Sequence, residues 1–170
     1  MSYYSATAYP TCAFDGIQKE VGGSSGTYDV YLNIYNTRHN VKSPLEVEFE
    51  ANSYAGDHAS VKVKVKLEES LAEGHVCYVV LWEDKVAGNY RFVERRMGPY
   101  EVITVTKAND VQVIRRAFAL DAGWNKANLG VSAIVQKLAT REILNGRATK
   151  LVEGIAVEAT SLGRVRALYR

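Results

Sequence analysis

The stretch LEVEFEANSYAGDHASVKVKVKL, residues Leu45–Leu67, decides the fold. Apolar residues alternate with three glutamates before Gly56 and with three lysines after it, which is the period of a β-strand with one buried face. Antiparallel pairing about Gly56 predicts four apolar pairs, Leu45/Leu67, Val47/Val65, Phe49/Val63 and Ala51/Val61, and three charged pairs, Glu46/Lys66, Glu48/Lys64 and Glu50/Lys62. Burial sets this register, because a slip by one residue would turn every apolar side chain into water. The hairpin therefore needs a second apolar sheet to cover it.

Composition and charge exclude several classes of protein. The 170 residues, 47% of them hydrophobic and 24% charged, suit one well-cored domain or one domain with a smaller appendage. A net charge of +2 argues against nucleic-acid binding, which needs a basic face. The longest apolar run, Val76–Trp82, is too short to cross a bilayer, so no transmembrane segment is expected. Ser2–Tyr9 has neither the basic start nor the apolar core of a signal peptide, which leaves a cytoplasmic chain or one whose export signal lies outside this sequence.

The N-terminal residues predict two short strands and a helix. Thr11–Phe14 and Ile17–Val21 flank the turn signal Asp15–Gly16. From Thr27 onward the period changes, with apolar residues at i, i+3, i+4 and i+7: Tyr28, Tyr31, Leu32 and Tyr35. We expect this face of the helix to pack against a core rather than to bind a ligand.

Further strands follow the hairpin. In Val76–Trp82 both alternating sets of residues are largely apolar, which predicts a strand that is covered on both faces. The second sheet would cover one face, and the N-terminal helix or a neighbouring subunit would cover the other. Later strands are predicted at 89–97, 101–107, 111–120, 131–138 and 141–144. Asn145–Gly146 is the strongest short turn signal in the chain.

Several motifs resemble known folds. Ala8-Tyr9-Pro10-Thr11, Ala13-Phe14-Asp15-Gly16, Val21-Gly22-Gly23 and the tyrosine-rich helix to Arg38 resemble the second half of a thioredoxin-like domain. The later motifs are Val79-Val80-Leu81-Trp82-Glu83-Asp84, Tyr90-Arg91-Phe92-Val93-Glu94-Arg95, Phe118-Ala119-Leu120-Asp121-Ala122-Gly123-Trp124-Asn125 and Val135-Gln136 to Arg141-Glu142-Ile143-Leu144. They resemble the immunoglobulin-like sandwich attached to such domains in secreted and outer-membrane bacterial proteins.

The resemblance implies a mainly β fold: an immunoglobulin-like antiparallel β-sandwich with a small N-terminal β-β-α appendage resembling a partial thioredoxin fold. The expected divisions are a β-β-α segment over residues 1–42, a sandwich over 43–154 and a basic C-terminal tail over 155–170. The tail is either a docked or frayed terminus or a segment that contacts another subunit.

The chain departs from the thioredoxin pattern where the chemistry lies, because it has no Cys-x-x-C turn. Cys12 follows Pro10 by two residues, inside a predicted strand, and we expect a structural role for it. Cys12 and Cys77 are either two buried thiols or a single disulfide.

No catalytic triad, phosphate-binding glycine loop, paired-carboxylate motif or cofactor site is recognisable, so the chain is not expected to be an enzyme. No metal site is expected either, although three aspartates at loop positions, Asp84, Asp110 and Asp121, are weak candidates for calcium ligands.

The favoured hypothesis starts from the missing half of the thioredoxin-like unit. A partial sheet exposes unpaired strand edges, which recruit a strand from another chain. The sequence therefore predicts a non-enzymatic extracellular or cell-surface structural subunit that self-associates into an oligomer or polymer through its termini. The candidate contact residues are Tyr3, Tyr4, Tyr9, Val165, Leu168 and Tyr169.

Two alternatives remain open. One is a ligand-binding or adhesion module that uses the loops around Trp82, Trp124 and Tyr90, with Tyr90 and Trp124 as the candidate contact residues. Trp124 also fits a role as a plug at the end of the sandwich. The other is a redox protein that lacks its dithiol half.

Overall fold

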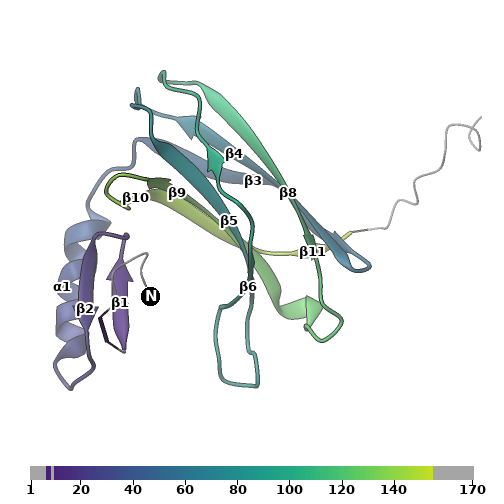
Figure 1. The fold of residues 1–170 in the computed structure, drawn as a ribbon, viewed down its shortest axis with the longest axis horizontal. Coiled ribbons are helices and arrows are strands. Elements are labelled where there is room, and N and C mark those ends of the chain that lie inside the picture. The colour runs from purple at the N-terminus through teal and green to yellow at the C-terminus, as the bar shows by residue number, and fades with distance from the viewer. Residues whose placement is uncertain (1–6, 9, 155–170) are drawn as a thin grey trace, which may run out of the picture.

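The computed structural model describes residues 7, 8 and 10–154, which form a two-sheet sandwich with a small β-β-α unit beside one end of it (Figure 1). The unit comprises β1 (Thr11–Phe14), β2 (Gln18–Val21) and α1 (Thr27–His39). The predicted fold class, an immunoglobulin-like β-sandwich with a β-β-α appendage, is confirmed. The predicted division at residues 42 and 43 falls between α1 and the first strand of the sandwich, and the tail 155–170 lies outside the described residues.

Two sheets enclose the core. One has the strand order β11-β3-β4-β8 and the other β10-β9-β5-β6, with β7 also paired to β5. Their bounds are β3 (Leu45–Ala55), β4 (His58–Leu67), β5 (His75–Glu83), β6 (Val93–Met97), β7 (Glu101–Val102), β8 (Val111–Ala119), β9 (Leu129–Lys137), β10 (Ile143–Lys150) and β11 (Val152–Glu153), with a 3₁₀ turn, η1 (Lys126–Asn128), before β9. The strands pair antiparallel except β11, which runs parallel to β3.

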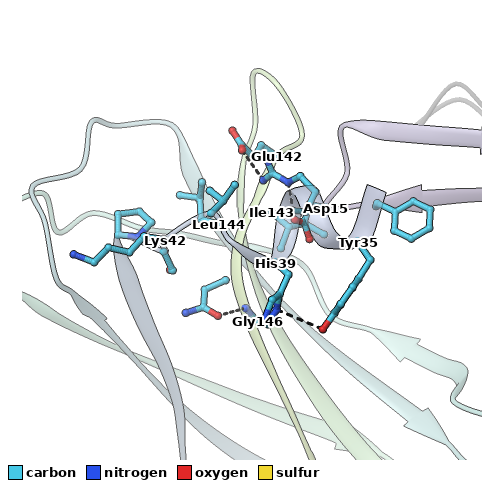
Figure 2. Close-up of a pocket in the computed structure, with 14 residues that line it drawn as sticks. Asp15, Tyr35, His39, Lys42, Glu142, Ile143, Leu144 and Gly146 are labelled. Carbon is cyan, nitrogen blue, oxygen red and sulfur yellow. Dashed lines mark hydrogen bonds and ion pairs between the residues drawn. The ribbon is translucent and has the colours of Figure 1, made fainter. Parts of the chain in front are cut away.

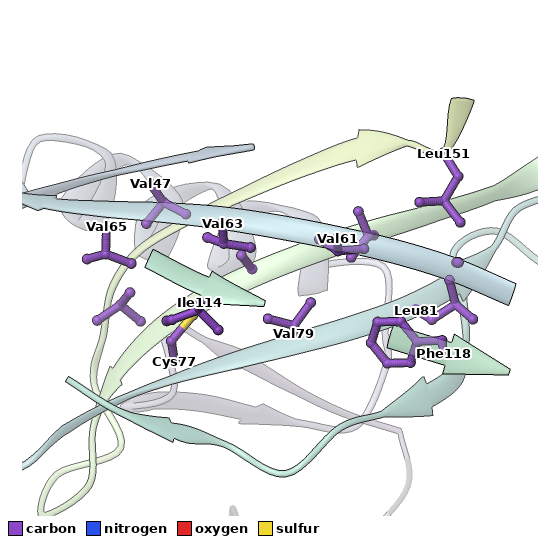
Figure 3. Packing of buried hydrophobic residues seen from close by; sticks show 14 of the residues in the cluster. Val47, Val61, Val63, Val65, Cys77, Val79, Leu81, Ile114, Phe118 and Leu151 are labelled. Carbon is purple, nitrogen blue, oxygen red and sulfur yellow. The ribbon is translucent and has the colours of Figure 1, made fainter. Parts of the chain in front are cut away.

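The inner faces of the sheets interdigitate as the hairpin pattern requires (Figure 3). Val63 and Val65 of β4 and Val79 of β5 are fully buried, and Ile114 and Phe118 of β8 pack into the same cluster. Burying one such side chain contributes about 1.5–3 kcal/mol. The apolar contact between the two sheets is therefore the main source of stability in the sandwich.

The predicted hairpin register is confirmed from Leu45 to Phe49 and wrong from Ala51 onward. A β-bulge between Phe49 and Ala51 makes Ala51 the partner of Lys62 and Asn52 the partner of Val61. The inserted residue switches which residues of β3 face inward, so Tyr54, opposite the buried Ala59, packs against the core.

Two of the three predicted charged pairs of the hairpin are present despite the bulge. Lys62 reaches Glu50 at 2.7 Å and Lys64 reaches Glu48 at 2.5 Å, as predicted. Lys66 bonds Glu68 at 2.7 Å rather than the predicted Glu46, although Glu46 is its partner across the strands. These are surface contacts, so burial rather than charge sets the register.

Three later predictions were wrong in detail. Residues 89–92 belong to a hairpin loop, because β6 begins only at Val93, and the predicted strand 101–107 is reduced to Glu101–Val102. The Asn145–Gly146 turn signal lies inside β10, at a bulge, where the Asn145 side chain donates to the Leu45 carbonyl at 2.7 Å. The chain turns earlier, where the Arg141 amide donates to the Lys137 carbonyl at 2.8 Å.

Side-chain hydrogen bonds bridge the sandwich along both of its long edges. On one edge, Gln112 of β8 accepts from the Thr104 amide and donates to the Val102 carbonyl, both at 2.8 Å. On the other, Asn52 of β3 donates to the Lys150 carbonyl of β10 at 2.6 Å. The backbone groups at these edges are therefore less available to a strand from another molecule.

Candidate functional surfaces

The β-β-α unit has a thin interior. Cys12 and Phe14 of β1 face α1, and the Phe14 ring meets the Tyr31 ring edge-on at a centroid distance of 5.2 Å. Burial, together with the neighbouring Cys12 thiol, raises the pKa of Tyr31. Ile34 and Arg38 follow Tyr31 at helical spacing and are likewise half-buried. The inward face of the helix is thus Tyr31, Ile34 and Arg38.

The prediction that Tyr28, Tyr31, Leu32 and Tyr35 form one packed face was wrong for three of the four. Tyr28 is 71% exposed, Leu32 39% and Tyr35 53%, and among the described side chains of α1 none is buried. The three residues lie at i, i+4 and i+7 and therefore form a continuous apolar strip along the helix. We call Tyr28, Leu32 and Tyr35 the α1 stripe.

A charged junction ties the unit to the sandwich (Figure 2). Arg38 of α1 reaches Asp15 of the β1–β2 turn and Glu142 of the β9–β10 turn, each at 2.8 Å. The Ile143 amide donates to the Asp15 carbonyl at 2.8 Å. The hydrogen bonds to the two carboxylates raise the pKa of Arg38. No local sequence pattern predicts this junction, because Arg38 and Glu142 are 104 residues apart.

A pocket of about 310 Å³ lies at this junction. Its walls include Tyr35 and His39, whose rings stack at 5.2 Å, and Asn145 and Gly146 of β10. Arg38 lines the pocket but is already paired with Asp15 and Glu142, so its charge joins the two parts of the molecule and is not free to hold a ligand.

A second, apolar hollow lies on the outer face of the β5 sheet. It measures about 480 Å³ and is lined by Val80, Trp82, Phe92, Glu94, Met97, Ser132, Ile134 and Ala148, which we call the Trp82 groove. The Trp82 indole donates to the Ser132 hydroxyl at 3.0 Å, which fixes the ring. The Phe92 ring stands edge-on to it at 5.2 Å and is 59% exposed. The two-faced apolar run Val76–Trp82 predicted a covered outer face, whereas at this groove the face is open.

The β5–β6 hairpin holds Phe92 in an unusual backbone conformation. Phe92 has φ +52°, in the left-handed region, which costs a non-glycine residue roughly 1–2 kcal/mol. Two ion pairs support the loop: Arg91 bonds Asp84, and Arg95 reaches Glu83 at 2.8 Å. The Arg91 guanidinium holds the pKa of Asp84 below its usual range. The loop is therefore braced rather than loose, and it forms one wall of the groove.

The two predicted surface-binding residues lie in different surroundings. Tyr90 is 67% exposed and pairs with Val86 across the β5–β6 hairpin. Trp124 is half-buried against the core, and the guanidinium groups of Arg95 and Arg96 lie 5.6 and 5.5 Å from its ring. This packing suits a plug at the end of the sandwich better than an open stacking platform. The candidate contact residues Tyr3, Tyr4, Tyr9, Val165, Leu168 and Tyr169 lie outside the described residues.

Both cysteines are free thiols, so the disulfide alternative is not realised in the structure. Cys77 lies in the sandwich core, where burial raises the pKa of its thiol to about 12. Cys12 is half-buried in β1. The two thiols therefore belong to separate interiors.

The aspartates considered for calcium are held by separate local contacts. Asp84 pairs with Arg91, Asp110 accepts from the Lys107 amide and Asp121 accepts from the Gly123 amide. Within residues 7, 8 and 10–154, no group of three or more His, Cys, Asp or Glu could hold a metal ion. The helices of this part of the chain lack the length and hydropathy of a membrane span.

Comparisons with protein-family models and with curated protein sequences returned no match. Among solved structures, HBP35 of Porphyromonas gingivalis superposes with a TM-score of 0.73 at 16% identity, over 94% of this chain and 58% of that chain. A domain of the outer membrane lipoprotein Omp28 from the same organism gives a TM-score of 0.50 at 20% identity, over 65% of this chain and 90% of that domain. The chain thus spans little more than half of the HBP35 chain. At these identities the likeness establishes the fold: a β-sandwich of the kind found in two Porphyromonas proteins, extended by the β-β-α unit.

Proposed function

We propose that the chain is a non-enzymatic structural subunit of the cell surface or extracellular space that self-associates through its β-β-α unit. The observation that carries the proposal is the exposed α1 stripe. A helix in a globular protein normally buries its apolar strip, whereas Tyr28, Leu32 and Tyr35 are 71%, 39% and 53% exposed. A second copy of the chain would cover them.

The unpaired strand edges of the β-β-α unit also favour self-association through this unit. Within the described part of the chain, β1 and β2 pair only with each other, so each has one free edge. A two-stranded sheet is marginally stable by itself in water. Because side chains bridge the long edges of the sandwich, the free edges of β1 and β2 are the natural sites for strand addition, which gains main-chain hydrogen bonds and burial together.

The cell-surface location is supported by one of the structural neighbours. The Omp28 domain comes from an outer membrane lipoprotein and shares the sandwich fold.

The test is the mass of the full chain in solution as a function of concentration, measured by light scattering after size exclusion. We expect masses above that of the 18.8 kDa monomer at high concentration. The double variant Tyr28→Ser/Leu32→Ser should be monomeric, because it removes the apolar strip without touching the helix interior. The matched control Asn33→Ser/Asn36→Ser, which alters exposed polar positions of the same helix, should associate like the wild type. A wild-type chain that stays monomeric throughout would refute the proposal.

The Trp82 groove favours a second candidate function, a ligand-binding or adhesion module. Its volume lies within the range of small-molecule sites, and its walls are mostly apolar with two polar groups, Glu94 and Ser132. A glycan and peptide array probed with the wild type and with Trp82→Ala tests it. Saturable binding that the variant loses would support this function, and the absence of any binding would remove it.

A further inference from the structure

The outer edge of β1 carries backbone groups that β2 does not use. The Gly22 amide donates to the Pro10 carbonyl at 2.7 Å, so these two residues form a hydrogen-bonded pair at the end of the β1–β2 ladder remote from the turn. Bonded and non-bonded pairs alternate along an antiparallel ladder. Cys12 therefore bonds β2, whereas Thr11 and Ala13 direct their N–H and C=O groups to the free edge. Within the described part of the chain, β2 is the one strand that pairs with β1.

The two edges of the unit differ in charge. Along β2 the outward-pointing residue Lys19 is exposed, and a lysine on an edge strand opposes pairing with another molecule. Along β1, the segment Thr11–Phe14 carries no charged side chain. An uncharged edge meets no like-charge repulsion when it approaches a copy of itself. The edge of β1 is therefore the more open of the two to strand addition.

We propose that two copies of the chain pair through β1, antiparallel and about a two-fold axis, so that their small sheets join into one sheet of order β2-β1-β1-β2. This inference rests on the proposed self-association and names its strand and its symmetry. An antiparallel edge is its own complement, because a two-fold rotation places the donors of each copy opposite the acceptors of the other. The contact is isologous and closes at two copies. It also extends a two-stranded sheet, which is marginally stable by itself.

The edge allows one register. Thr11 and Ala13 must each meet a residue whose groups also point outward, and Thr11 opposite Ala13 of the second copy satisfies both pairs at once. A shift by two residues in one direction would need Asp15, whose φ of +46° takes it out of the strand. A shift in the other direction would carry Ala13 past the beginning of the opposite strand at Thr11. Cys12 consequently lies opposite Cys12 of the second copy, as a non-hydrogen-bonded pair.

The α1 stripe lies on the same side of the unit as this edge. Successive helical residues are turned by about 100°, so the stripe lies roughly a quarter turn from the inward face of Tyr31, Ile34 and Arg38. The quarter turn is toward β1, because Tyr35 lines the pocket at the charged junction together with Phe14, the last residue of β1. Pairing through β1 therefore brings the two stripes toward each other on one face of the joined sheet. Strand pairing and burial of the stripe are thus gained in a single contact.

Proline substitutions distinguish the two edges. The mass of the wild type should rise with concentration and level off at twice the 18.8 kDa of one chain. Ala13→Pro should be monomeric, because proline removes the outward N–H and its ring obstructs the edge. Lys19→Pro is the matched control: Lys19 pairs with Ala13 across the hairpin, and its N–H points outward on the β2 edge. This control should dimerise like the wild type, and circular dichroism shows whether each variant is folded.

Cys12 provides a second readout that leaves the edge unaltered. In a non-hydrogen-bonded pair the Cα atoms are about 4.5 Å apart, within the span of a disulfide. With diamide as oxidant, the two Cys12 thiols give two electrons and two protons to its N=N bond, and one S–S bond joins the chains. In the control Thr11→Cys/Cys12→Ser the two thiols are diagonal neighbours about 7–8 Å apart, beyond that span. Non-reducing electrophoresis should show a two-chain band for the wild type and none for this control.

The outcomes separate this pairing from self-association in general. If the wild type assembles but gives no cross-link, or if folded Ala13→Pro assembles equally well, the β1 pairing is wrong while self-association stands. Loss of assembly in Lys19→Pro alone would overturn it in favour of the β2 edge. A mass that continues to rise beyond two copies would contradict the closed dimer. If Ala13→Pro does not fold, the cross-link of the wild type decides. A wild type that is monomeric at every concentration would end both proposals.

Discussion

Arg38 in α1 and Glu142 in the β9–β10 turn form a 2.8 Å ion pair across 104 residues of sequence, and this pair anchors the β-β-α unit to the sandwich. The Arg38 side chain is 16% exposed and is shared with Asp15, so both of its contacts are shielded in part from water. The α1 stripe is consequently presented at a fixed place on the molecule rather than on a loose arm.

Arg38→Gln should loosen the unit. We expect the free energy of unfolding to fall by about 1–2 kcal/mol, because two charge-assisted hydrogen bonds are lost at a half-buried position. Urea unfolding measures the change in both variants, and in Arg38→Gln limited trypsin digestion should show faster cleavage than in the wild type after Lys42, between α1 and β3. Lys42→Gln is the control: Lys42 is 82% exposed and pairs with Glu69 at 3.4 Å, so its loss should cost less than about 0.5 kcal/mol. Equal losses of unfolding free energy in the two variants would show that Arg38 does not anchor the β-β-α unit to the sandwich.

Alanine substitutions at Gly16 and Gly56 distinguish the cost of backbone strain from the cost of a steric clash. Both glycines have positive φ, +74° and +58°, so alanine at either position is strained by about 1–2 kcal/mol. A Cβ at Gly16 would also lie 1.9 Å from the Arg141 carbonyl oxygen, whereas a Cβ at Gly56 meets nothing within 4 Å. Gly16→Ala should therefore destabilise the chain by a further 1–3 kcal/mol, about the cost of overpacking, relative to Gly56→Ala. Chemical denaturation of both variants tests this, and matching losses would mean that the turn is not pressed against Arg141.

Acid should weaken the brace under the Trp82 groove. The pKa of Asp84 is held below its ordinary 3.8 by Arg91, so the folded state binds its proton less tightly than the unfolded state does. The stability from this pair is complete above the unfolded pKa and is lost as the pH falls below 3.8 toward the lower folded value. Asp84→Asn should be less stable than the wild type near pH 6, and the gap should narrow between pH 4 and pH 2. Urea unfolding across that range gives the answer, and a gap that stays constant would show that the Arg91 pair does not stabilise the fold.

The two thiols should differ sharply in reactivity. Burial in the core raises the pKa of Cys77 to about 12, so at pH 8 almost none of it is the reactive thiolate. Cys12 is half-buried in the thin β-β-α unit and should be alkylated in the folded protein. Mass spectrometry after iodoacetamide treatment should find one label in native protein and two after unfolding in guanidinium. Two labels in native protein would indicate that the sandwich core opens readily.

The hairpin shows which structural features could be predicted from the sequence and which could not. Alternation fixed the strands, the inward face and the register from Leu45 to Phe49, because burial of one face dominates there. The bulge at Glu50 was not predictable from alternation, since it depends on the packing of Tyr54 against the far sheet. The tight turn predicted at Asn145–Gly146 was wrong for a similar reason. The Asn145 side chain instead bonds the carbonyl of Leu45 in β3, which lies 100 residues away in the sequence.

The functional surfaces were less accessible from sequence than the fold. Periodicity found α1 but placed its packed face on the wrong side, because apolar residues occur all round the helix and Arg38 turns inward to meet two carboxylates. The apolar outer face of β5 was foreseen from Val76–Trp82, but not the groove, whose other walls come from Phe92, Met97 and Ile134 on separate strands and loops. Such surfaces are made by tertiary contacts that have no local signature.

Hydrogen exchange of the α1 amides at low and high protein concentration tests self-association through the β-β-α unit most directly. If copies meet through this unit, the amides of residues 27–39 should exchange more slowly at high concentration, while those of β8, on the opposite sheet, should not change. Equal exchange in α1 at both concentrations, under conditions where the chain is folded, would contradict the account.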